Sequence, residues 1–435
     1  MMKKIERFLG ACAKKAITRD KPVIVAIGGS VGKTSARQAL TLALEASLGK
    51  DDFRASRKNF NNELGVPLSV FGCDAPGKNV FKWLALLYTG AAYALGIKRL
   101  NMRYVVLEMA ADHPGDLDYL ISLAPPSVAI MTAMGPEHTE FFGSTENAVA
   151  EERKLLQSLP PDGEAILNGD DIDCRDSASL TQAEVIYYGR EPQATVTILG
   201  CKSIYDSLLP DKAGTEVELA VLQNHSYKLF LKGVFGDTHA YAIASALAFC
   251  VSMDHMSGPV IGYLQQHYTG MPGRSRLVPG VKNTMLLDDS YNAQPQAMKK
   301  AVHELSKFPV EPGSKRIAVL GEMLELGDLA EKEHREVGRW AAVNNIDFLV
   351  CCGKLARIIG DSAVNSGLPR DKVVYFENSS EAGLYIQQQV LKKGDVVLIK
   401  GSQGSRMEKI TKELMADPLK APELLVRQSP EWQNR

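Results

Sequence analysis

The sequence predicts an α/β protein built from two α/β domains, and three features indicate this class. Short apolar segments alternate with helical segments along both halves of the chain, which is typical of mostly parallel sheets. A glycine-rich loop joins the first of these segments to an alanine-rich helix. The 435 residues also exceed what one hydrophobic core usually holds, so we expect more than one domain.

The expected elements divide the chain into three parts. We expect an amphipathic helix in residues 1–19, a central domain with a P-loop-type, mostly parallel sheet in residues 20–270, and a Rossmann-like C-terminal domain in residues 271–435. Strands are expected at 23–27, 104–107, 128–132 and 165–168, and then at 285–288, 316–320, 348–351, 373–376 and 396–400. Residues 195–199, 216–221 and 227–231 resemble half-buried strands, which predicts a flanking antiparallel sheet.

Composition argues against several classes of function. The chain has 50 basic and 51 acidic residues, so no overall field favours nucleic acid, and we expect small-molecule partners. Its seven cysteines form no Cys-x-x-Cys pair, which argues against a structural zinc site and a disulfide framework. The first 18 residues lack the apolar core of a signal peptide. We therefore expect a cytoplasmic protein.

One apolar segment, residues 81–97, qualifies this expectation. Basic residues flank it on both sides, and its 17 residues are a borderline length for crossing a bilayer. Three interpretations are open: a helix packed on protein, a helix at a membrane surface, and a membrane span. We favour the first, because the strand that follows has to return to the same sheet.

A phosphate-binding loop is predicted after the first strand. Gly29, Ser30, Val31, Gly32, Lys33, Thr34 and Ser35 follow an apolar run in the order of the short Gly-x-x-Gly-Lys-Thr form. Glycines permit a sharp turn, so backbone N–H groups and the N-terminus of the next helix can face an anion, while Lys33 adds a positive charge. Thr34 is expected to hold Mg²⁺. The expected cofactors are therefore ATP and Mg²⁺.

Further polar residues follow later strands. Glu108 ends an apolar strand, at the edge where open α/β sheets bind their ligands, and its carboxylate would complete Mg²⁺ coordination with Thr34. His138 follows the next strand beside two carboxylates, so a second metal ligand and a structural histidine are both open interpretations. The loop Asn61–Glu63 is rich in hydrogen-bonding groups, and a helix cap is as good an interpretation as a site.

Six segments together resemble the Mur ligase family. They are Gly29–Ser35, Asn61-Asn62-Glu63-Leu64-Gly65-Val66-Pro67, Leu107-Glu108-Met109, Pro272-Gly273-Arg274, Asp288-Asp289-Ser290-Tyr291-Asn292-Ala293-Gln294-Pro295 and Leu320-Gly321-Glu322-Met323-Leu324-Glu325-Leu326-Gly327. The resemblance runs from about residue 20 to residue 415, and its asparagine-rich and Asp-Ser-Tyr-Asn-Ala-x-Pro motifs are far more specific than the P-loop. Within the family, the sequence is most similar to the branch that adds D-alanyl-D-alanine to a peptidoglycan precursor.

The resemblance implies ATP-dependent amide ligation through an acyl phosphate, which depends above all on charge neutralisation. It implies that Lys33 holds the β and γ phosphates, that Thr34 and Glu108 hold a first Mg²⁺, and that His138 holds a second. Arg274, Asp289 and Asn292 would meet the nucleotide when the domains close and exclude water. The implied substrate-side residues are Asn61, Asn62, Glu63, Glu325, Lys400 and Ser402. For Glu325 and His334 a structural role is an equal alternative.

Three departures from the family pattern have consequences. Members of the family usually carry a carbamylated lysine as a metal-binding carboxylate; Glu152 aligns with it here, and Lys154 is the alternative after a small shift of register. His239 stands where many relatives have asparagines that contact adenine. Relatives also have an N-terminal domain that binds the UDP end of the substrate, whereas about 20 residues precede the first expected strand here.

The leading hypothesis is a ligase of peptidoglycan synthesis, and so of cell-wall formation, cell shape and cell division. It would join D-alanyl-D-alanine, or a similar amine, to a cell-wall peptide precursor. The precursor would be held by the central domain, by a partner chain, or through a lipid carrier near residues 81–97. The alternatives are a similar ligase acting on another carboxylate, such as a cofactor precursor or a poly-amino-acid, and an inactive nucleotide-binding scaffold.

Overall fold

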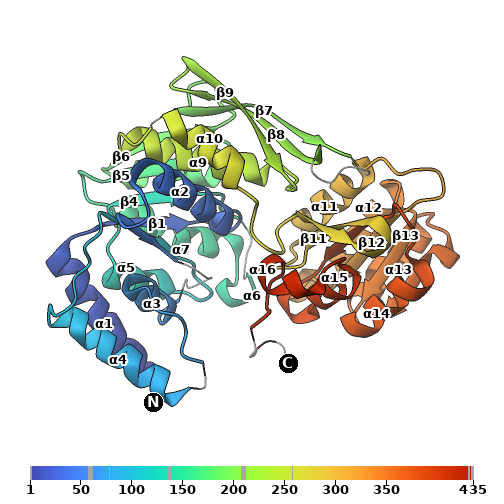
Figure 1. Cartoon of the computed structure of the whole chain (residues 1–435), viewed down its shortest axis with the longest axis horizontal. Coiled ribbons are helices and arrows are strands. Elements are labelled where there is room, and N and C mark those ends of the chain that lie inside the picture. The colour runs from blue at the N-terminus through green and yellow to red at the C-terminus, as the bar shows by residue number, and fades with distance from the viewer. Residues whose placement is uncertain are drawn as a thin grey trace. The chain divides into compact units, whose positions relative to one another are not determined.

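The computed structural model describes residues 2–56, 62–77, 79–135, 139–206, 212–256, 258–429 and 432 (Figure 1). The chain forms two compact units. Unit 1 holds Met1–Gly200, Val217–Leu229 and Asp237–Tyr268, and unit 2 holds Cys201–Glu216, Phe230–Gly236 and Thr269–Arg435. The strands between residues 196 and 232 therefore contribute residues to both units.

The first sheet has nine strands in the order β2-β3-β1-β4-β5-β6-β7-β8-β9. Their bounds are β1 Val23–Gly28, β2 Phe53–Ala55, β3 Tyr104–Glu108, β4 Val128–Met131, β5 Glu164–Asn168, β6 Glu184–Gly189, β7 Val196–Ile204, β8 Gly214–Val221 and β9 His225–Lys232. Strands β1 to β6 pair in parallel, with β1 between β3 and β4. The expected strands at 195–231 do form, and they continue the edge of this sheet through β6 and β7.

Helices cover both faces of the parallel strands. In Figure 1, α2, α9 and α10 lie on one face, and α1, α3, α4, α5 and α7 lie on the other. The bounds are α1 Met2–Asp20, α2 Lys33–Leu48, α3 Gly65–Phe71, α4 Val80–Ala94, α5 Asp116–Leu123, α6 Thr139–Phe142, α7 Thr145–Gln157, α8 Ile172–Asp176, η1 Ser177–Leu180, α9 Thr238–Ser252 and α10 Gly258–His267. Because both faces are covered, β3 and β4 are buried along their whole length.

Unit 2 contains a six-stranded sheet in the order β10-β11-β15-β12-β13-β14, in which only the β10–β11 pair is antiparallel. The strand bounds are β10 Arg276–Gly280, β11 Thr284–Asp289, β12 Arg316–Gly321, β13 Phe348–Cys352, β14 Val373–Phe376 and β15 Val396–Lys400. The helix bounds are α11 Pro295–Lys307, α12 Ala330–Val343, α13 Ala356–Asn365, α14 Ser379–Tyr385, α15 Glu408–Leu414 and α16 Ala421–Leu424. Short single turns are η3 Val281–Asn283, η4 Gly327–Leu329, η5 Arg370–Lys372, η6 Ile386–Val390, η7 Gln403–Ser405 and η8 Pro418–Lys420.

Two apolar cores hold this second sheet between its helices. One packs α11, α12 and α13 on one face, and the other packs α14 and α15 on the opposite face. Ala213 and Phe235, from the segments before and after β8 and β9, belong to the first of these cores. The α/β class and the mostly parallel sheets expected from the sequence are confirmed.

The apolar segment at residues 81–97 forms α4, which packs on α1. Gly90 and Tyr93 are among its buried residues, whereas Phe81 and Tyr88 are exposed. Among the residues that the structure describes, none of the helices has the length and apolar character needed to cross a bilayer.

Candidate active site

The phosphate-loop motif lies between β1 and α2, and its two glycines have the backbone geometry that the motif requires. Gly29 has a φ of 107° and Gly32 a φ of 101°, a region that residues with a Cβ rarely adopt. A Cβ at Gly29 would also come within 2.5 Å of Thr132 Oγ1 and 2.9 Å of the Ala133 carbonyl oxygen. Both glycines are therefore needed for the turn itself.

The donors of this loop point at acceptors of the protein. Ser30 N donates to the Ala133 carbonyl at 2.6 Å, and Gly29 N donates to Glu152 Oε2 at 2.9 Å. The Lys33 ammonium lies against the carbonyl oxygens of Gly29 and Ser30. Val31 N is 3.4 Å from the same Ala133 oxygen. A phosphate in the loop would exchange these carbonyl acceptors for its own oxygens.

Thr34 and Glu108 meet beside the loop, as the sequence predicted. The Thr34 hydroxyl donates to Glu108 Oε2 at 3.1 Å, and both side chains are buried. The other carboxylate oxygen, Glu108 Oε1, accepts from Arg37 Nε at 2.5 Å. Arg37 also donates to the Ser56 carbonyl oxygen, and its Nη2 is buried and has no hydrogen-bond partner among the described residues.

Arg37 is the functional residue that the sequence analysis missed. It lies one turn after Thr34 on α2, so its side chain projects from the same face as the threonine. The sequence did contain a signal for this role of Arg37, namely a basic residue on the buried face of an alanine-rich helix. The ion pair places a fixed positive charge behind the carboxylate, and this fixes the direction of Glu108.

Helix α7 carries the two residues proposed for the carbamate position, and their surroundings differ. Glu152 is buried and accepts the hydrogen bond from the first glycine of the loop. Lys154 Nζ instead forms ion pairs with Glu151 Oε2 and Asp118 Oδ2, both at 2.7 Å. Burial lowers the pKa of Lys154, but hydrogen bonds and charges of Asp118 and Glu151 outweigh this and raise it. A protonated lysine does not form a carbamate, so this environment favours Glu152.

Glu151 has a structural function that the sequence did not reveal. Its Oε1 accepts from the backbone N–H groups of Gly115 at 3.0 Å and Leu117 at 3.1 Å, at the start of α5. These groups have no partner within the helix, so a carboxylate satisfies them. Glu151 thereby ties α7 to α5.

Several predicted residues lie in or next to a part of the chain outside the described residues. Asn61 and His138 belong to it, so their contacts are not described. Asn62 caps α3 by accepting from Gly65 N at 2.9 Å, and Glu63 is exposed. In unit 1, His239 is buried and its Nδ1 lies 2.9 Å from the Tyr268 hydroxyl.

In unit 2, Asp289 and Lys400 form a buried ion pair. Lys400 Nζ lies 2.7 Å from Asp289 Oδ2 and donates to the Asn292 carbonyl oxygen at 2.9 Å. Asp289 Oδ1 also accepts from Ser275 N at 3.1 Å. The guanidinium of Arg274 lies over the ring of Tyr291, 4.0 Å from its centroid. The pair thus holds the backbone at Ser275, directly after Arg274, and at Asn292.

The neighbouring Asp288 is completely buried. Burial raises the pKa of Asp288 to about 6, although hydrogen bonds from Ser290 and Thr411 oppose this effect. The Thr411 hydroxyl donates to Oδ1 at 3.0 Å, and Oδ2 is buried as well. Charging this carboxyl in the folded state is therefore unfavourable.

The loop after β12 is held by His334 and Ser402. His334 Nε2 accepts from Met323 N at 3.0 Å, and its Nδ1 lies 2.6 Å from the Ala330 carbonyl oxygen, which assigns the Nδ1–H tautomer. Burial lowers the pKa of His334. Ser402 Oγ accepts from Leu324 N at 2.9 Å, and Glu325 has a φ of 64°. These contacts support the structural alternative for His334.

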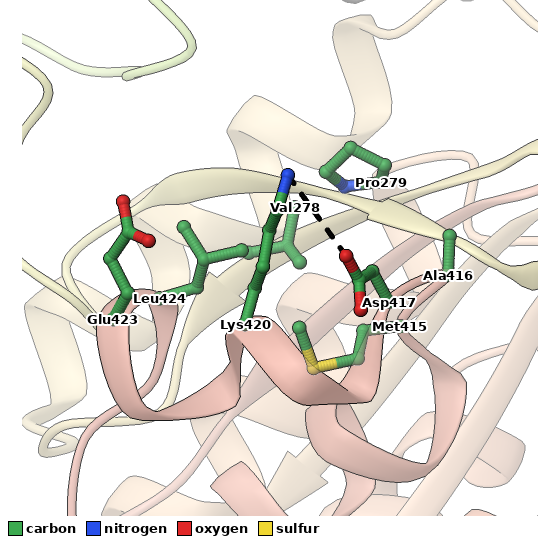
Figure 2. Close-up of a pocket in the computed structure, with 8 residues that line it drawn as sticks. All are labelled: Val278, Pro279, Met415, Ala416, Asp417, Lys420, Glu423 and Leu424. Atoms are coloured by element: carbon green, nitrogen blue, oxygen red, sulfur yellow. Dashed lines mark ion pairs between the residues drawn. The ribbon is translucent and has the colours of Figure 1, made fainter.

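Possible metal and ligand sites depend on the side chains that the described residues bring together. Among the described residues, no group of three or more His, Cys, Asp or Glu side chains is placed to hold a metal ion. A hollow of about 220 Å³ lies in unit 2 (Figure 2). Its lining comes from β10 and from residues 415–424, and includes none of the residues predicted for the site.

Comparison with known proteins decides the family. The model of the Mur ligase middle domain matches residues 89–250, and that of the Mur ligase glutamate ligase domain matches residues 273–403. The chain belongs to the Mur ligase family. As a Mur ligase, it has relatives called UDP-N-acetylmuramoyl-tripeptide--D-alanyl-D-alanine ligase in Mycobacterium tuberculosis strain H37Rv, Bacillus subtilis and Escherichia coli. They are 29%, 27% and 28% identical over 91%, 91% and 90% of this chain, which covers 73%, 76% and 76% of their lengths.

Solved structures show the same fold for this Mur ligase. The MurF ligase of Thermotoga maritima in complex with ADP matches with a TM-score of 0.73 and 24% identity, over 94% of this chain and 83% of its own. A MurF from Acinetobacter baumannii gives the same score and identity, over 94% and 80%. The folylpolyglutamate synthase of M. tuberculosis, also complexed with ADP, matches with a TM-score of 0.62 and 15% identity, over 94% of both chains.

Proposed function

We propose that this Mur ligase uses ATP to join D-alanyl-D-alanine to the free carboxylate of a UDP-N-acetylmuramoyl-tripeptide. The observation that carries the proposal is the contact of Thr34 with Glu108 beside a phosphate loop, in a chain that aligns over 90–91% of its length with relatives named for this reaction. A carboxylate attacks the γ-phosphate to give an acyl phosphate and ADP. The amine of the dipeptide then attacks the acyl carbon, and phosphate leaves.

The donor groups at the loop fit Mg²⁺-ATP. The hydroxyl of Thr34 and the carboxylate of Glu108 are hard oxygen ligands of the kind that Mg²⁺ prefers. When bound, the ion supplies charge neutralisation for the phosphates. We propose Glu152 and His138 for a second ion. For Glu152, the support is its buried position against Gly29.

The chain's own residues bind and orient the reactants. Backbone N–H groups of the loop and the N-terminus of α2 would bind the phosphates after exchanging their present protein acceptors for phosphate oxygens, and Lys33 can turn from the loop carbonyls in the same way. Arg37 keeps Glu108 in place. We assign Arg274 and Asn292 to nucleotide binding, with Asp289 and Lys400 as the pair that holds this loop. Asn62, Glu63, Glu325 and Ser402 are proposed on the substrate side, together with Asn61.

The proposed substrates also indicate the cellular compartment of the reaction. ATP and nucleotide-linked sugar precursors are cytoplasmic metabolites, so we propose a cytoplasmic reaction. A lipid-linked precursor, or a partner chain that presents the precursor, is the alternative that the sequence raised. In either case the same loop and the same two-step ligation would operate.

The test is phosphate release from Mg²⁺-ATP by the purified protein with UDP-muramoyl-tripeptide, with D-alanyl-D-alanine added or withheld. Dipeptide-dependent release, and a product heavier by one dipeptide minus water in mass spectrometry, are expected. Lys33→Ala is the matched inactive control, because it removes the mobile charge from the loop. If intact protein binds ATP but gives no dipeptide-dependent product, the carboxylate is a different one. The second candidate, a ligase for another carboxylate, would then replace the first.

A further inference from the structure

Helices α1 and α4 form a tightly packed pair at the N-terminal end of unit 1 (Figure 1). Gly90 of α4 faces α1 so closely that a Cβ there would lie 3.1 Å from Leu9 Cδ2. At the other end of the pair, Arg19 donates to the Tyr93 carbonyl oxygen at 2.5 Å and pairs with Asp20. Both helices run in the same direction, so their N-terminal ends lie together beside the N in Figure 1.

The face of α4 that does not contact α1 carries large exposed apolar side chains. Phe81 is 81% exposed, Leu84 58% and Tyr88 68%. Their spacing of three and four residues puts them on one side of the helix. Exposed apolar residues continue around this stripe with Val80, Leu95 and Ile97. Contiguous exposed apolar surface of this kind marks an interaction site.

Basic residues surround the apolar stripe. The exposed face of α1 carries Lys3, Lys4, Arg7, Lys14 and Lys15, and Lys82, Lys98 and Arg99 are exposed at the two ends of α4. Residues 75–107 contain no acidic residue. On α1, Asp20 is paired: chiefly the hydrogen bond from Arg19, and then other contacts, lower the pKa of Asp20 to about 2. The whole chain has a net charge of −1, so this concentration of positive charge is local.

We propose that the exposed faces of α1 and α4, here called the α1–α4 surface, bind the surface of an anionic membrane. Apolar and aromatic side chains between lysines and arginines are the pattern of helices that lie in the lipid interface. The basic side chains would meet lipid phosphates while Phe81, Leu84 and Tyr88 enter the boundary with the acyl chains. This places the ligase at the surface of a bilayer, and it holds whichever carboxylate the enzyme ligates.

A second copy of the chain is the competing occupant, and charge argues against it. A symmetric dimer brings the same patch of both copies together. That arrangement would place the lysines of one α1–α4 surface against those of the other. Repulsion between like charges across an interface is unfavourable, whereas an anionic lipid surface neutralises them.

The experiment is co-sedimentation of the full chain with vesicles of phosphatidylcholine and phosphatidylglycerol in equal amounts, compared with phosphatidylcholine alone. We expect binding to the mixed vesicles that weakens as salt rises from about 0.1 to about 0.5 M. Phe81→Glu/Leu84→Glu should lower vesicle affinity more than tenfold. Lys3→Gln/Lys4→Gln should lower it about fivefold per charge removed. The matched control is Val343→Glu/Leu419→Glu, which adds the same charges at exposed apolar positions of unit 2 and should bind as wild type does.

Circular dichroism and ATP binding of each variant show that the fold and the loop are intact, because none of these positions belongs to the candidate active site. Absence of wild-type binding to the mixed vesicles would overturn the proposal. Equal loss in the control pair would do so as well. A wild-type dimer that Phe81→Glu/Leu84→Glu converts to monomer, with no vesicle binding, would instead assign the surface to a second copy.

Discussion

Replacing Arg37 with methionine is expected to destabilise unit 1 by about 3 kcal/mol, near the lower end of what removing one partner of a buried ion pair costs. Arg37 is 5% exposed and Glu108 is 2% exposed, so water cannot compensate the carboxylate once the guanidinium is gone. The change also removes the hydrogen bond to the Ser56 carbonyl oxygen. Methionine keeps most of the volume of the side chain, so the loss is electrostatic rather than a cavity effect.

A double-mutant cycle isolates the cost of leaving the buried Glu108 carboxylate without its positive partner. Glu108→Gln in the Arg37→Met background removes the uncompensated charge, so the double variant should recover about 2 kcal/mol relative to Arg37→Met alone. Phosphate release should be lost in the double variant, because glutamine does not replace the carboxylate as a Mg²⁺ ligand. Recovery of stability without recovery of activity would separate the two functions of Glu108.

The assay is urea unfolding followed by tryptophan fluorescence. The chain has three tryptophans, of which Trp83 is in unit 1 and Trp340 and Trp432 are in unit 2. With Trp340→Phe and Trp432→Phe as background, the signal reports unit 1. Arg175→Met is the control, because the pair of Arg175 with Glu191 is about half exposed and should be worth less than about 1 kcal/mol. An Arg37→Met protein as stable as this control would refute the reasoning.

Three further predictions concern the loop, α7 and unit 2. Gly29→Ala should abolish ATP binding in calorimetry, because a Cβ there would clash with Thr132 and Ala133, which follow β4. The control is Gly115→Ala, which is also at positive φ but has no neighbour close to the added Cβ, and it should bind ATP as wild type does. Glu152→Ala should lower phosphate release at least about a hundredfold. Lys154→Ala should remain active, and its activity should not depend on bicarbonate. Full activity in Glu152→Ala, together with loss of a bicarbonate-dependent activity in Lys154→Ala, would assign the carbamate to Lys154. The free energy of unfolding of unit 2 should fall as the pH rises from 3.8 through about 6, because folded Asp288 binds its proton more tightly than unfolded Asp288. Asp288→Asn should remove this slope in Trp340-detected unfolding, and an unchanged slope would contradict the assignment.

The sequence predicted those elements whose signals are local. The apolar run at β1, the glycines of the loop and the terminal position of Glu108 each fix their own geometry, and the structure brings Thr34 and Glu108 together as expected. Contacts between residues that are distant in the sequence could not be predicted from local patterns. Nothing local indicates that Glu152 meets Gly29, 123 residues away, or that Lys400 pairs with Asp289. These contacts depend on which strands become neighbours in the sheet.

For the same reason, the sequence did not predict the ion pair of Arg37 or the pairing at the edge of the first sheet. Whether a basic residue on a helix face is buried or exposed can be predicted only when the strand beside that face is known. Here that strand is β3, which ends in Glu108, the partner of Arg37. Alternating side chains predicted the strands at 195–231, but the pattern gives no information on whether they pair with each other alone or also with β6.

The division of β7, β8 and β9 between the two units has a consequence for how this protein can be cut or inherited. Residues 201–216 and 230–236 belong to unit 2, and they supply Ala213 and Phe235 to its core. There the ring of Phe235 packs against that of Phe308 at an angle of 57°, with ring centroids 4.9 Å apart. A fragment that starts at residue 271 would lack both side chains and expose Phe308. Recombination at that point between related genes would therefore yield a working second half only if the donor and recipient shared this distant strand segment.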